Sequence, residues 1–539
     1  MKSATRGNRL FATNPQVNRP RSTFSRPSDI KTTFEGNFLV PIYWDEVLPG
    51  DTFNVKATFF GRLATPIVPI MDNAYLETFW FYCPNRLLWT NFAKQQGEQE
   101  NPGDSTNFLT PILSNTATAS VTVNGLWDYF GHPLTDAPGF TTQPIITALH
   151  MRMYNKTWNE WFRDQDYQDS VDVPTGDGPD DYEVFYGLLP INKFHDYITS
   201  SRPEPLKGPE LNMPVIATGQ APIERVSNAP GWVLYNGGTN TLTTTGQNMN
   251  TSGTGNKWSA SSLSPGGSIS ADPSGGLIAD LDAASFVGPT LNAFRELTAT
   301  QRVYEADMRG GTRYNEGIYT HFGVVNPDNR VNRVLFLGSG KSYVNVFQVA
   351  QTSETDTGTP QGNLAAYGTI NAHGHGFFQS FSEHGFVFGL AAVRADLHYQ
   401  NIVERMFTRR TRFDYYTPEF ANLGEQALLG QEVNFAGNGT TDIEPAAYTE
   451  RWAEYRFKQS VITSYMRSQA PTSLDVWHLA QDFGGRFPVE VNGTFMQENA
   501  PWDRVVAVTD EPIFILNGYV ENKTTRVMPI RSVPGLTRI

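Results

Sequence analysis

The chain is 539 residues long, with 18% charged and 13% aromatic residues. Because an ordinary soluble domain carries roughly 25% charged residues, this composition favours a protein that buries surface against partners over a solitary monomeric enzyme. The single cysteine, Cys83, excludes an internal disulfide and a multi-cysteine zinc or iron–sulfur site, and it fits folding in a reducing cytoplasm. The longest apolar run, Phe386–Val393, is too short to span a bilayer, so no membrane insertion is expected.

The N-terminal segment is a basic arm on an acidic protein. Residues 1–31 hold seven basic residues and one acid, whereas the rest of the chain holds 34 basic and 53 acidic residues. This asymmetry predicts a polyanion on one side of the protein.

The arm shows no helical or strand period, so on its own it should be extended or partly disordered. Arginine can neutralise phosphates and phenylalanine can stack on unpaired bases; the alternatives are a solvated tail or an arm that laces neighbouring subunits together. The candidate residues for contact with a polyanion are Arg6, Arg9, Arg19, Arg21, Arg26 and Lys31.

Two strands are predicted early in the chain. From Asp51 to Phe60, apolar and polar residues alternate, which is the period of a half-buried β-strand. From Ala74 to Tyr82, apolar and aromatic residues fall on both faces, so this strand should be covered on both sides, either inside a sandwich or by another chain. Together they predict the start of an antiparallel β core.

Further elements follow from the same periodicities. A helix is predicted over Tyr154–Gln165, where aromatic residues recur at helical spacing, and a second over residues 291–308. Further strands are predicted at Arg333–Leu337, Ser342–Ala350, Arg504–Val508 and Pro512–Leu516.

A polar segment interrupts these elements. Gly, Ser, Thr and Asn dominate residues 226–275, where Lys257 and Asp272 are the only charged residues. This composition is typical of a flexible loop or linker, yet a structureless loop of this length is uncommon in a compact domain unless it has a function. Its aromatic residues, which give it something to pack with, are Trp232, Tyr235 and Trp258.

No stretch carries a complete catalytic or metal-binding motif. The acidic segment Asp164–Asp181 could hold a hard cation such as Ca²⁺, but it lacks the spacing of an EF-hand loop, and a solvated loop is the alternative. Gly338–Ser342 (GSGKS) resembles a phosphate-binding loop, but Leu335 stands at the position of the first required glycine. His373 and His375 have no clear third ligand nearby. We therefore expect no catalytic residue, no metal site, no cofactor and no enzyme activity.

One segment, Arg405–Tyr416 (RMFTRRTRFDYY), is basic and aromatic at once. That pattern can mark a nucleic-acid surface, and arginines at subunit contacts would give the same pattern.

Long and unusual stretches recur through the chain: Pro41–Asp51, Leu63–Asp72, Phe81–Trp89, Leu189–Tyr197, Glu305–Tyr314, Glu383–Asp396, Leu423–Leu428, Tyr448–Arg456 and Ser473–Leu479. They resemble the major capsid protein of the gokushoviruses, a branch of the microviruses, which are small single-stranded-DNA bacteriophages. The resemblance extends from about residue 36 to the end and is weakest in the arm and in the polar segment.

The resemblance implies a mainly β fold, an eight-stranded antiparallel viral jelly roll with long loop insertions and a few short helices. It implies an arm over residues 1–35 that faces the capsid interior and a jelly-roll capsid domain over residues 36–539. It also implies that an insertion at residues 206–290 forms a protrusion at the threefold axes and recognises the host surface; a disordered linker is the alternative. Host recognition would then involve Trp232, Tyr235 and Trp258.

The implied function is structural. Roughly sixty copies would assemble into a T=1 icosahedral shell around circular single-stranded DNA. A small basic packaging protein, a scaffolding protein and a bacterial surface receptor would be further partners. The protein would be made in the cytoplasm of the host bacterium and would reside in the virion. Deleting residues 2–31 should still permit assembly but lower the DNA retained. A carbohydrate-binding β-rich protein and a trimeric adhesin are the alternatives, and neither accounts for the basic arm.

Overall fold

The computed structural model describes residues 20–114, 123–134, 146–208, 290–310, 314–323, 332–352, 361–483 and 489–531, together with short strands between residues 216 and 287. The chain divides into two compact units. The body comprises Met1–Pro205 and Gly310–Ile539, and the insertion unit comprises Leu206–Arg309.

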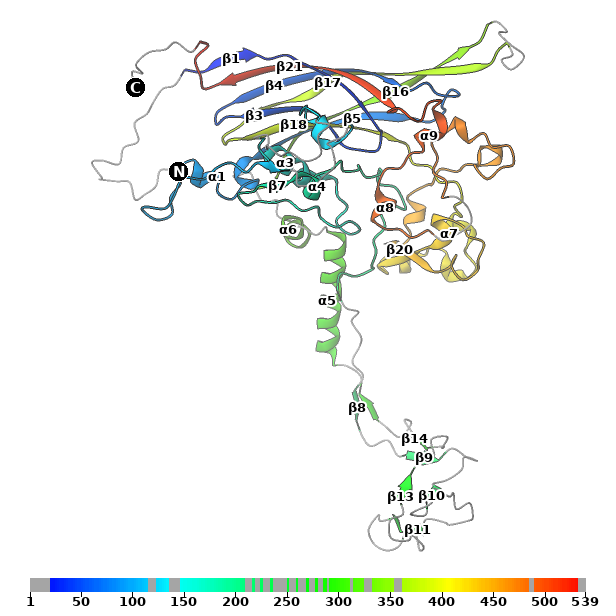
Figure 1. The fold of residues 1–539 in the computed structure, drawn as a ribbon. Helices are drawn as coiled ribbons and strands as arrows, with labels where there is room; N and C mark the ends of the chain where they lie inside the picture. Colours follow the sequence, from blue (N-terminus) through cyan, green and yellow to red (C-terminus); the bar gives the residue numbers. More distant parts are fainter. Residues whose placement is uncertain are drawn as a thin grey trace. The chain divides into compact units, whose positions relative to one another are not determined.

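The body is built on a nine-stranded antiparallel sheet that curls into two facing layers, a jelly roll (Figure 1). The first layer has the strand order β2-β21-β4-β17, and the second has the order β16-β5-β18-β3. Strands β16 and β17 pair with each other and join the layers at one corner. Because β1 and β2 lie end to end along β21, the nine strands occupy the eight positions that the jelly-roll prediction requires. The strands are β1 Ser22–Ser25, β2 Ser28–Phe34, β3 Val40–Val47, β4 Thr52–Leu63, β5 Ala74–Pro84, β16 Leu335–Ala350, β17 Leu364–Ser380, β18 Gly385–Ala395 and β21 Phe514–Arg526.

The main core lies between the two layers. Alternate residues of β4 point inward, so that Phe53, Val55 and Phe59 are buried, as the period of two predicts. Trp80 of β5 is fully buried and lies against Gly389 of β18, where a Cβ atom would come within 2.9 Å of the indole ring. The predicted strand from Asp51 to Phe60 is therefore confirmed as β4.

The outer face of the second layer is covered by other elements of the body. Helix α3 (Leu149–Thr157) continues into a π-helical turn, η3 (Trp158–Phe162), and these pack a second hydrophobic cluster against β5 and β18. The ring of Phe162, for example, lies edge-on to that of Phe79, with centroids 5.1 Å apart. Strand β5 is thus buried on both faces, as predicted, and the body itself covers both. The predicted helix is also confirmed, although it begins earlier, at Leu149, and ends earlier, at Phe162.

A third hydrophobic cluster organises short elements between β18 and β21. In this part of the chain, the predicted strand Arg504–Val508 is wrong. Trp502–Val505 instead forms a helical turn, α9, which buries the side chains of Trp502 and Val505, and Val506 makes an isolated bridge to Pro66. The β-branched valines of this stretch favour a strand, but burial of the side chains of Trp502 and Val505 stabilises a helical turn instead.

Two other strand predictions change in extent. The strands expected at Arg333–Leu337 and Ser342–Ala350 are one continuous strand, β16, with an irregularity at Phe336/Gly338. The strand expected at Pro512–Leu516 is the first part of β21, which continues to Arg526. Because GSGKS lies inside β16, the structure agrees with the rejection of a phosphate-binding loop.

The insertion unit contains a nested set of short antiparallel pairs. Strand β8 pairs with β15, β9 with β14, β10 with β13 and β11 with β12, so the chain runs out and returns along itself. Helix α5 (Leu291–Arg309) closes the unit and confirms the helix predicted at residues 291–308. The short strands are β8 Ile216–Thr218, β9 Ile223–Arg225, β10 Val233–Tyr235, β11 Asn250–Thr251, β12 Trp258–Ser259, β13 Ser268–Ser270, β14 Leu277–Ala279 and β15 Ser285–Val287.

The remaining short elements all belong to the body. The helical turns before the insertion unit are η2 Asn85–Leu87, α1 Phe92–Gln95, α2 Leu126–Tyr129 and α4 Tyr182–Phe185. Those after it are α6 Tyr314–Phe322, η5 Arg405–Phe407, η6 Arg412–Asp414, η7 Pro418–Phe420, α7 Gly430–Val433, η8 Ala453–Tyr455, η9 Ser464–Met466, η10 Asp475–Trp477 and α8 Gly493–Met496. The short strands are β6 Leu113–Ser114, β7 Asp180–Asp181, β19 Glu425–Leu429 and β20 Pro445–Glu450. Within the residues described, no helix combines the length and apolar character needed to cross a membrane.

Candidate functional site

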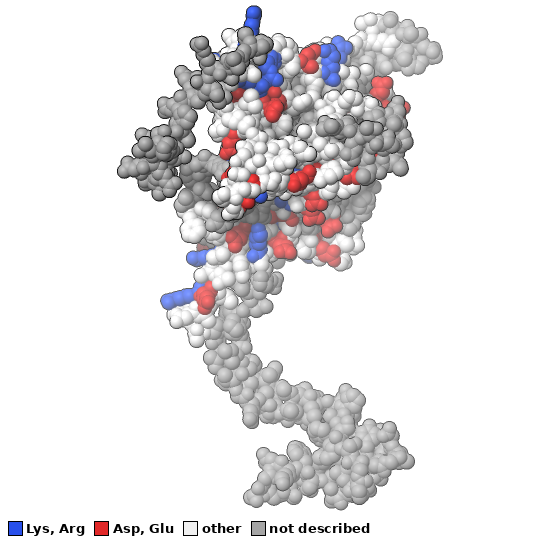
Figure 2. Space-filling model, turned by 60° about the vertical axis from the view of Figure 1, so that its left-hand side comes forward, with Lys and Arg blue, Asp and Glu red and all other residues white. Residues whose placement is uncertain are grey.

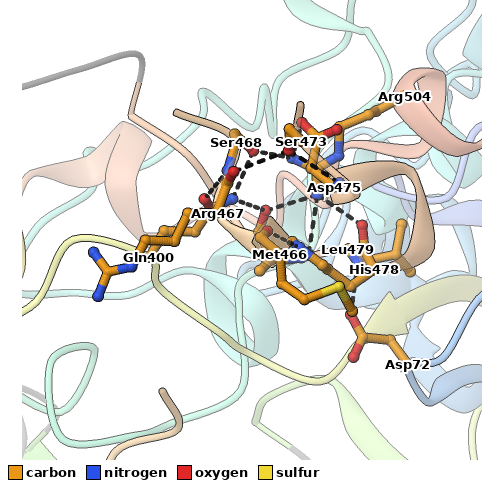
Figure 3. Close-up of polar contacts among 11 residues, drawn as sticks. Asp72, Gln400, Met466, Arg467, Ser468, Ser473, Asp475, His478, Leu479 and Arg504 are labelled. Carbon is orange, nitrogen blue, oxygen red and sulfur yellow. Dashed lines mark hydrogen bonds and ion pairs between the residues drawn. The ribbon is translucent and has the colours of Figure 1, made fainter. Parts of the chain in front are cut away.

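A polar cluster in the body has the residue types of a hydrolytic site (Figure 3). Both ring nitrogens of its histidine, His478, have a hydrogen-bond partner. Nε2 lies 2.6 Å from the carbonyl oxygen of Met466, and Nδ1 accepts a hydrogen bond from the backbone N–H of Ala480 at 3.1 Å. The hydroxyl of Ser473 donates to the carbonyl oxygen of Arg467 at 2.9 Å. Because neither imidazole nitrogen is open to take a proton from a hydroxyl, His478 is not placed to act as a general base.

The same cluster is well suited to holding loops together. Arg504 of α9 donates to the carbonyl oxygens of His478 and Ala480, at 2.7 and 2.9 Å. The carboxylate of Asp72, between β4 and β5, accepts the backbone N–H of Leu479 at 2.6 Å. These bonds tie residues 466–480 to the jelly roll, so we assign the cluster a structural role.

The arm residues that the structure describes are already paired within the chain. The guanidinium of Arg21 donates to the carbonyl oxygen of Gly50. Arg26 forms an ion pair with Asp45, with Nη1 and Oδ2 2.6 Å apart, and Lys31 pairs with its neighbour Asp29. Two segments of the arm form β1 and β2. The other candidates, Arg6, Arg9 and Arg19, lie outside the described residues.

The outer face of the first layer is exposed and carries basic and aromatic side chains. On β4, Lys56, Phe60 and Arg62 point outward, because the alternate residues enter the core. Exposed rings from neighbouring strands, Tyr519 of β21 and Phe378 of β17, point to the same side. Figure 2 shows blue atoms gathered at the top of the body, beside a few red ones, at the level of β21 and β4 in Figure 1. We call this surface, with Lys31 included, the basic–aromatic face.

Two of its cations have no carboxylate partner in the part of the chain that the structure describes. They are Lys56 and Arg62, whereas Lys523 pairs with Glu521 at 3.1 Å. Beside Arg62 lies a pocket of about 530 Å³, lined in part by Lys31, Phe60 and Trp44. A cation and an aromatic ring at one hollow are the groups that hold a phosphate and stack a base.

Sequence patterns identified this face only in part. The alternation in β4 indicates that Lys56 points away from the core. Tyr519 and Phe378 lie more than a hundred residues from β4 along the chain and from each other, and only the strand order brings them together. No local signal could have found them.

In the basic–aromatic segment Arg405–Tyr416, two of the four arginines form ion pairs, while Arg410 and Arg412 are exposed. Arg405 pairs with the buried carboxylate of Glu432 at 3.2 Å, and Arg409 pairs with Glu454 at 3.0 Å. Phe407 and Phe413 remain 74% and 63% exposed. The segment therefore presents exposed cations as well as exposed rings, and this arrangement is compatible with both alternatives, a nucleic-acid surface and a subunit contact.

Two sets of residues considered for metal binding have other partners. In the acidic segment, Asp180 forms a buried ion pair with Arg152, with Oδ2 and Nε 2.7 Å apart, and hydrogen bonds from Asn91 and Trp89 lower the pKa of Asp177. His375 lies between two hydroxyls, with Nδ1 2.8 Å from Oγ1 of Thr78 and Nε2 2.9 Å from Oγ of Ser342. Across the described ranges, no group of three or more His, Cys, Asp or Glu side chains could hold a metal ion.

A jelly roll with one covered and one exposed outer face places the chain in an architectural class that includes viral capsid proteins, lectins and cupins. Comparison with known proteins identifies the family: residues 13–536 match the capsid protein (F protein) family, and the chain belongs to it. It is 40% identical to capsid protein VP1 of Bdellovibrio phage phiMH2K over 99% of both chains. It is also 36% identical to capsid protein VP1 of Chlamydia phage 1, over 98% of both chains, and 32% identical to that of Spiroplasma virus 4, over 96% of both.

These matches confirm the resemblance to gokushovirus capsid proteins. The chain is a structural capsid protein of the virion and not an enzyme. Self-assembly into a capsid follows from membership of the family. The carbohydrate-binding and adhesin alternatives have no such support.

Proposed function

We propose that this capsid protein assembles into a T=1 icosahedral shell that encloses circular single-stranded DNA, with the basic–aromatic face turned toward the DNA. The observation that carries the proposal is the difference between the two outer faces of the jelly roll. One is covered by α3 and η3, while the other exposes Lys56 and Arg62 beside aromatic rings. On a chain with a net charge of −13, this is a surface that suits a polyanion with unpaired bases.

The other parts of the chain receive roles in the same proposal. The arm residues Arg6, Arg9 and Arg19 would add phosphate contacts inside the shell. The insertion unit would form the outer protrusion that binds a bacterial surface receptor, with Trp232, Tyr235 and Trp258 as contact candidates. Tyr235 and Trp258 belong to β10 and β12, and Trp232 lies outside the described residues. A small basic packaging protein and a scaffolding protein would assist assembly.

The DNA contact is tested by removing the two unpaired cations. Lys56→Gln with Arg62→Gln should weaken binding of the unassembled protein to an oligo-dT strand. Because each lost phosphate contact on a single strand lowers the salt slope by about 0.7, the slope of log K against log salt should become shallower by about 1.4. Fluorescence titration at several NaCl concentrations measures this slope.

The matched control removes two exposed cations from the covered side of the body. Lys94 lies on α1, and the guanidinium of Arg333 lies 5.6 Å from the Trp161 ring of η3. Lys94→Gln with Arg333→Gln makes the same change in net charge. An equal loss of slope in both double variants would show a general charge effect and contradict a DNA-binding face.

A further inference from the structure

Strands β16 and β17 continue past the rest of the jelly roll as a two-stranded ribbon (Figure 1). Tyr343 is the last residue of β16 that pairs with β5, and Gly368 is the residue of β17 at which pairing with β4 stops. Beyond these points the two strands pair only with each other, from Phe347↔Tyr367 to Ala350↔Leu364. We call residues 347–350 and 364–367 the ribbon. Both of its outer backbone edges lack a strand partner in the part of the chain that the structure describes.

One face of the ribbon is apolar and exposed. The rings of Phe347 and Tyr367 stack with centroids 5.3 Å apart, and these side chains are 47% and 50% exposed. Val349 follows on the same face, 46% exposed. Cross-strand aromatic pairs stabilise a ribbon, but two strands alone are marginally stable in water.

The ribbon also lacks the usual protection of a free edge. Exposed strands are normally guarded by Lys, Pro, bulges or inward-pointing charges. Residues 342–352 and 361–372 contain no charged residue and no proline, and the ladder is regular from Val344 to Ala350. A regular, uncharged and aromatic edge of this kind is suited to being covered by another polypeptide.

We propose that the ribbon is an assembly arm that docks on a second copy of this chain. The absence of charge makes DNA phosphates, anionic lipid and a basic packaging protein poor occupants. A neighbouring copy is the partner that self-assembly supplies, so this inference rests on the capsid role. With four paired residues in each strand, at about 3.3 Å per residue, the ribbon is about 13 Å long.

The test shortens the ribbon without touching the two layers. In this variant the whole segment 347–367 is replaced by Asn-Gly. A two-residue hairpin turn then connects Val346 to its ladder partner Gly368. Assembly is followed by sedimentation velocity over a range of protein concentrations. The critical concentration for shell formation should rise at least about tenfold, since each tenfold step corresponds to about 1.4 kcal/mol per subunit. The midpoint of thermal unfolding of the unassembled subunit should stay within a few degrees of the unmodified chain.

A point variant covers the case in which the shortened chain fails to fold. Val349→Glu places a charge on the apolar face, and Val184→Glu makes the same change at a 71%-exposed valine of α4. Val349→Glu should raise the critical concentration while Val184→Glu leaves it unchanged. Normal assembly of either folded ribbon variant would overturn the docking proposal and leave the capsid role intact. Failure of the unmodified chain to form shells would instead contradict the proposed function itself.

Discussion

At the scale of single residues, burial strongly shifts the pKa values of Lys193 and Glu498. Both side chains are almost completely buried, and the ammonium of Lys193 lies 3.9 Å from the centre of the Phe495 ring. Burial lowers the pKa of Lys193 to about 8 and raises the pKa of Glu498 to about 7, although Lys193 and Arg394 pull the latter back toward its ordinary value. Buried ionisable groups whose pKa values differ between the folded and unfolded states make stability depend on pH.

The pH dependence has a definite sign. Between pH 4.5 and about 7, the folded chain keeps the proton on Glu498 that the unfolded chain has lost, so the free energy of unfolding falls as the pH rises. The shift corresponds to about 3 kcal/mol. Glu498→Gln should abolish this fall and match the unmodified protein at pH 5. Thermal unfolding midpoints of the unassembled subunit at several pH values measure the effect.

A control for this prediction is Glu450→Gln, which changes a carboxylate that is 51% exposed. It should retain the fall between pH 4.5 and 7. If Glu498→Gln also retained it, the pH dependence would have to come from other groups.

At the scale of elements, one glycine determines whether two strands of the first layer can pair. Gly376 of β17 lies opposite Lys56 of β4, just after an irregularity in the ladder, and a Cβ atom there would lie 2.0 Å from the carbonyl oxygen of Val55. Because that atom is backbone, the clash can be relieved only by moving the strands apart. Gly376→Ala should therefore cost at least about 2 kcal/mol in the free energy of unfolding.

The matched substitution is Gly439→Ala, where a Cβ atom would meet nothing within 4 Å. Urea denaturation of the unassembled subunits compares the two variants. Equal midpoints would mean that β4 and β17 adjust without cost, contrary to this account of their packing.

Elements with a strong period were predictable from sequence, and elements defined by distant contacts were not. The alternation of β4 and the two-sided burial of β5 are local patterns, and both were predicted. The turn at Trp502–Val505 was predicted as a strand, because Val505 and Val506 favour β-structure when nearby packing is unknown. The basic–aromatic face could not be predicted as a unit, since Tyr519 and Phe60 meet only through the strand order.

At the scale of the whole molecule, the boundary between arm and jelly roll differs from the boundary that composition suggests. The basic composition extends to Lys31, but Ser22–Ser25 and Ser28–Phe34 are already strands paired with β21. Arg26 and Lys31 are held by carboxylates of the same chain. The segment that can be removed without disturbing the sheet therefore ends before Arg21.

This boundary changes the expectation for N-terminal deletions. Removal of residues 2–31 takes away β1 and most of β2, and so leaves the edge of β21 unpaired and opens the core beside Phe34 and Phe514, whose rings stack at 5.6 Å. We expect that chain to form few or no shells.

Removal of residues 2–19 leaves every described strand in place and takes away Lys2, Arg6, Arg9 and Arg19. Those shells should form normally but retain less DNA, because four phosphate-neutralising charges are lost from each subunit. Nuclease-protected DNA per particle, measured with sedimentation of the same fractions, separates the two effects. Full DNA content in the shorter deletion would assign the DNA contact to the basic–aromatic face alone.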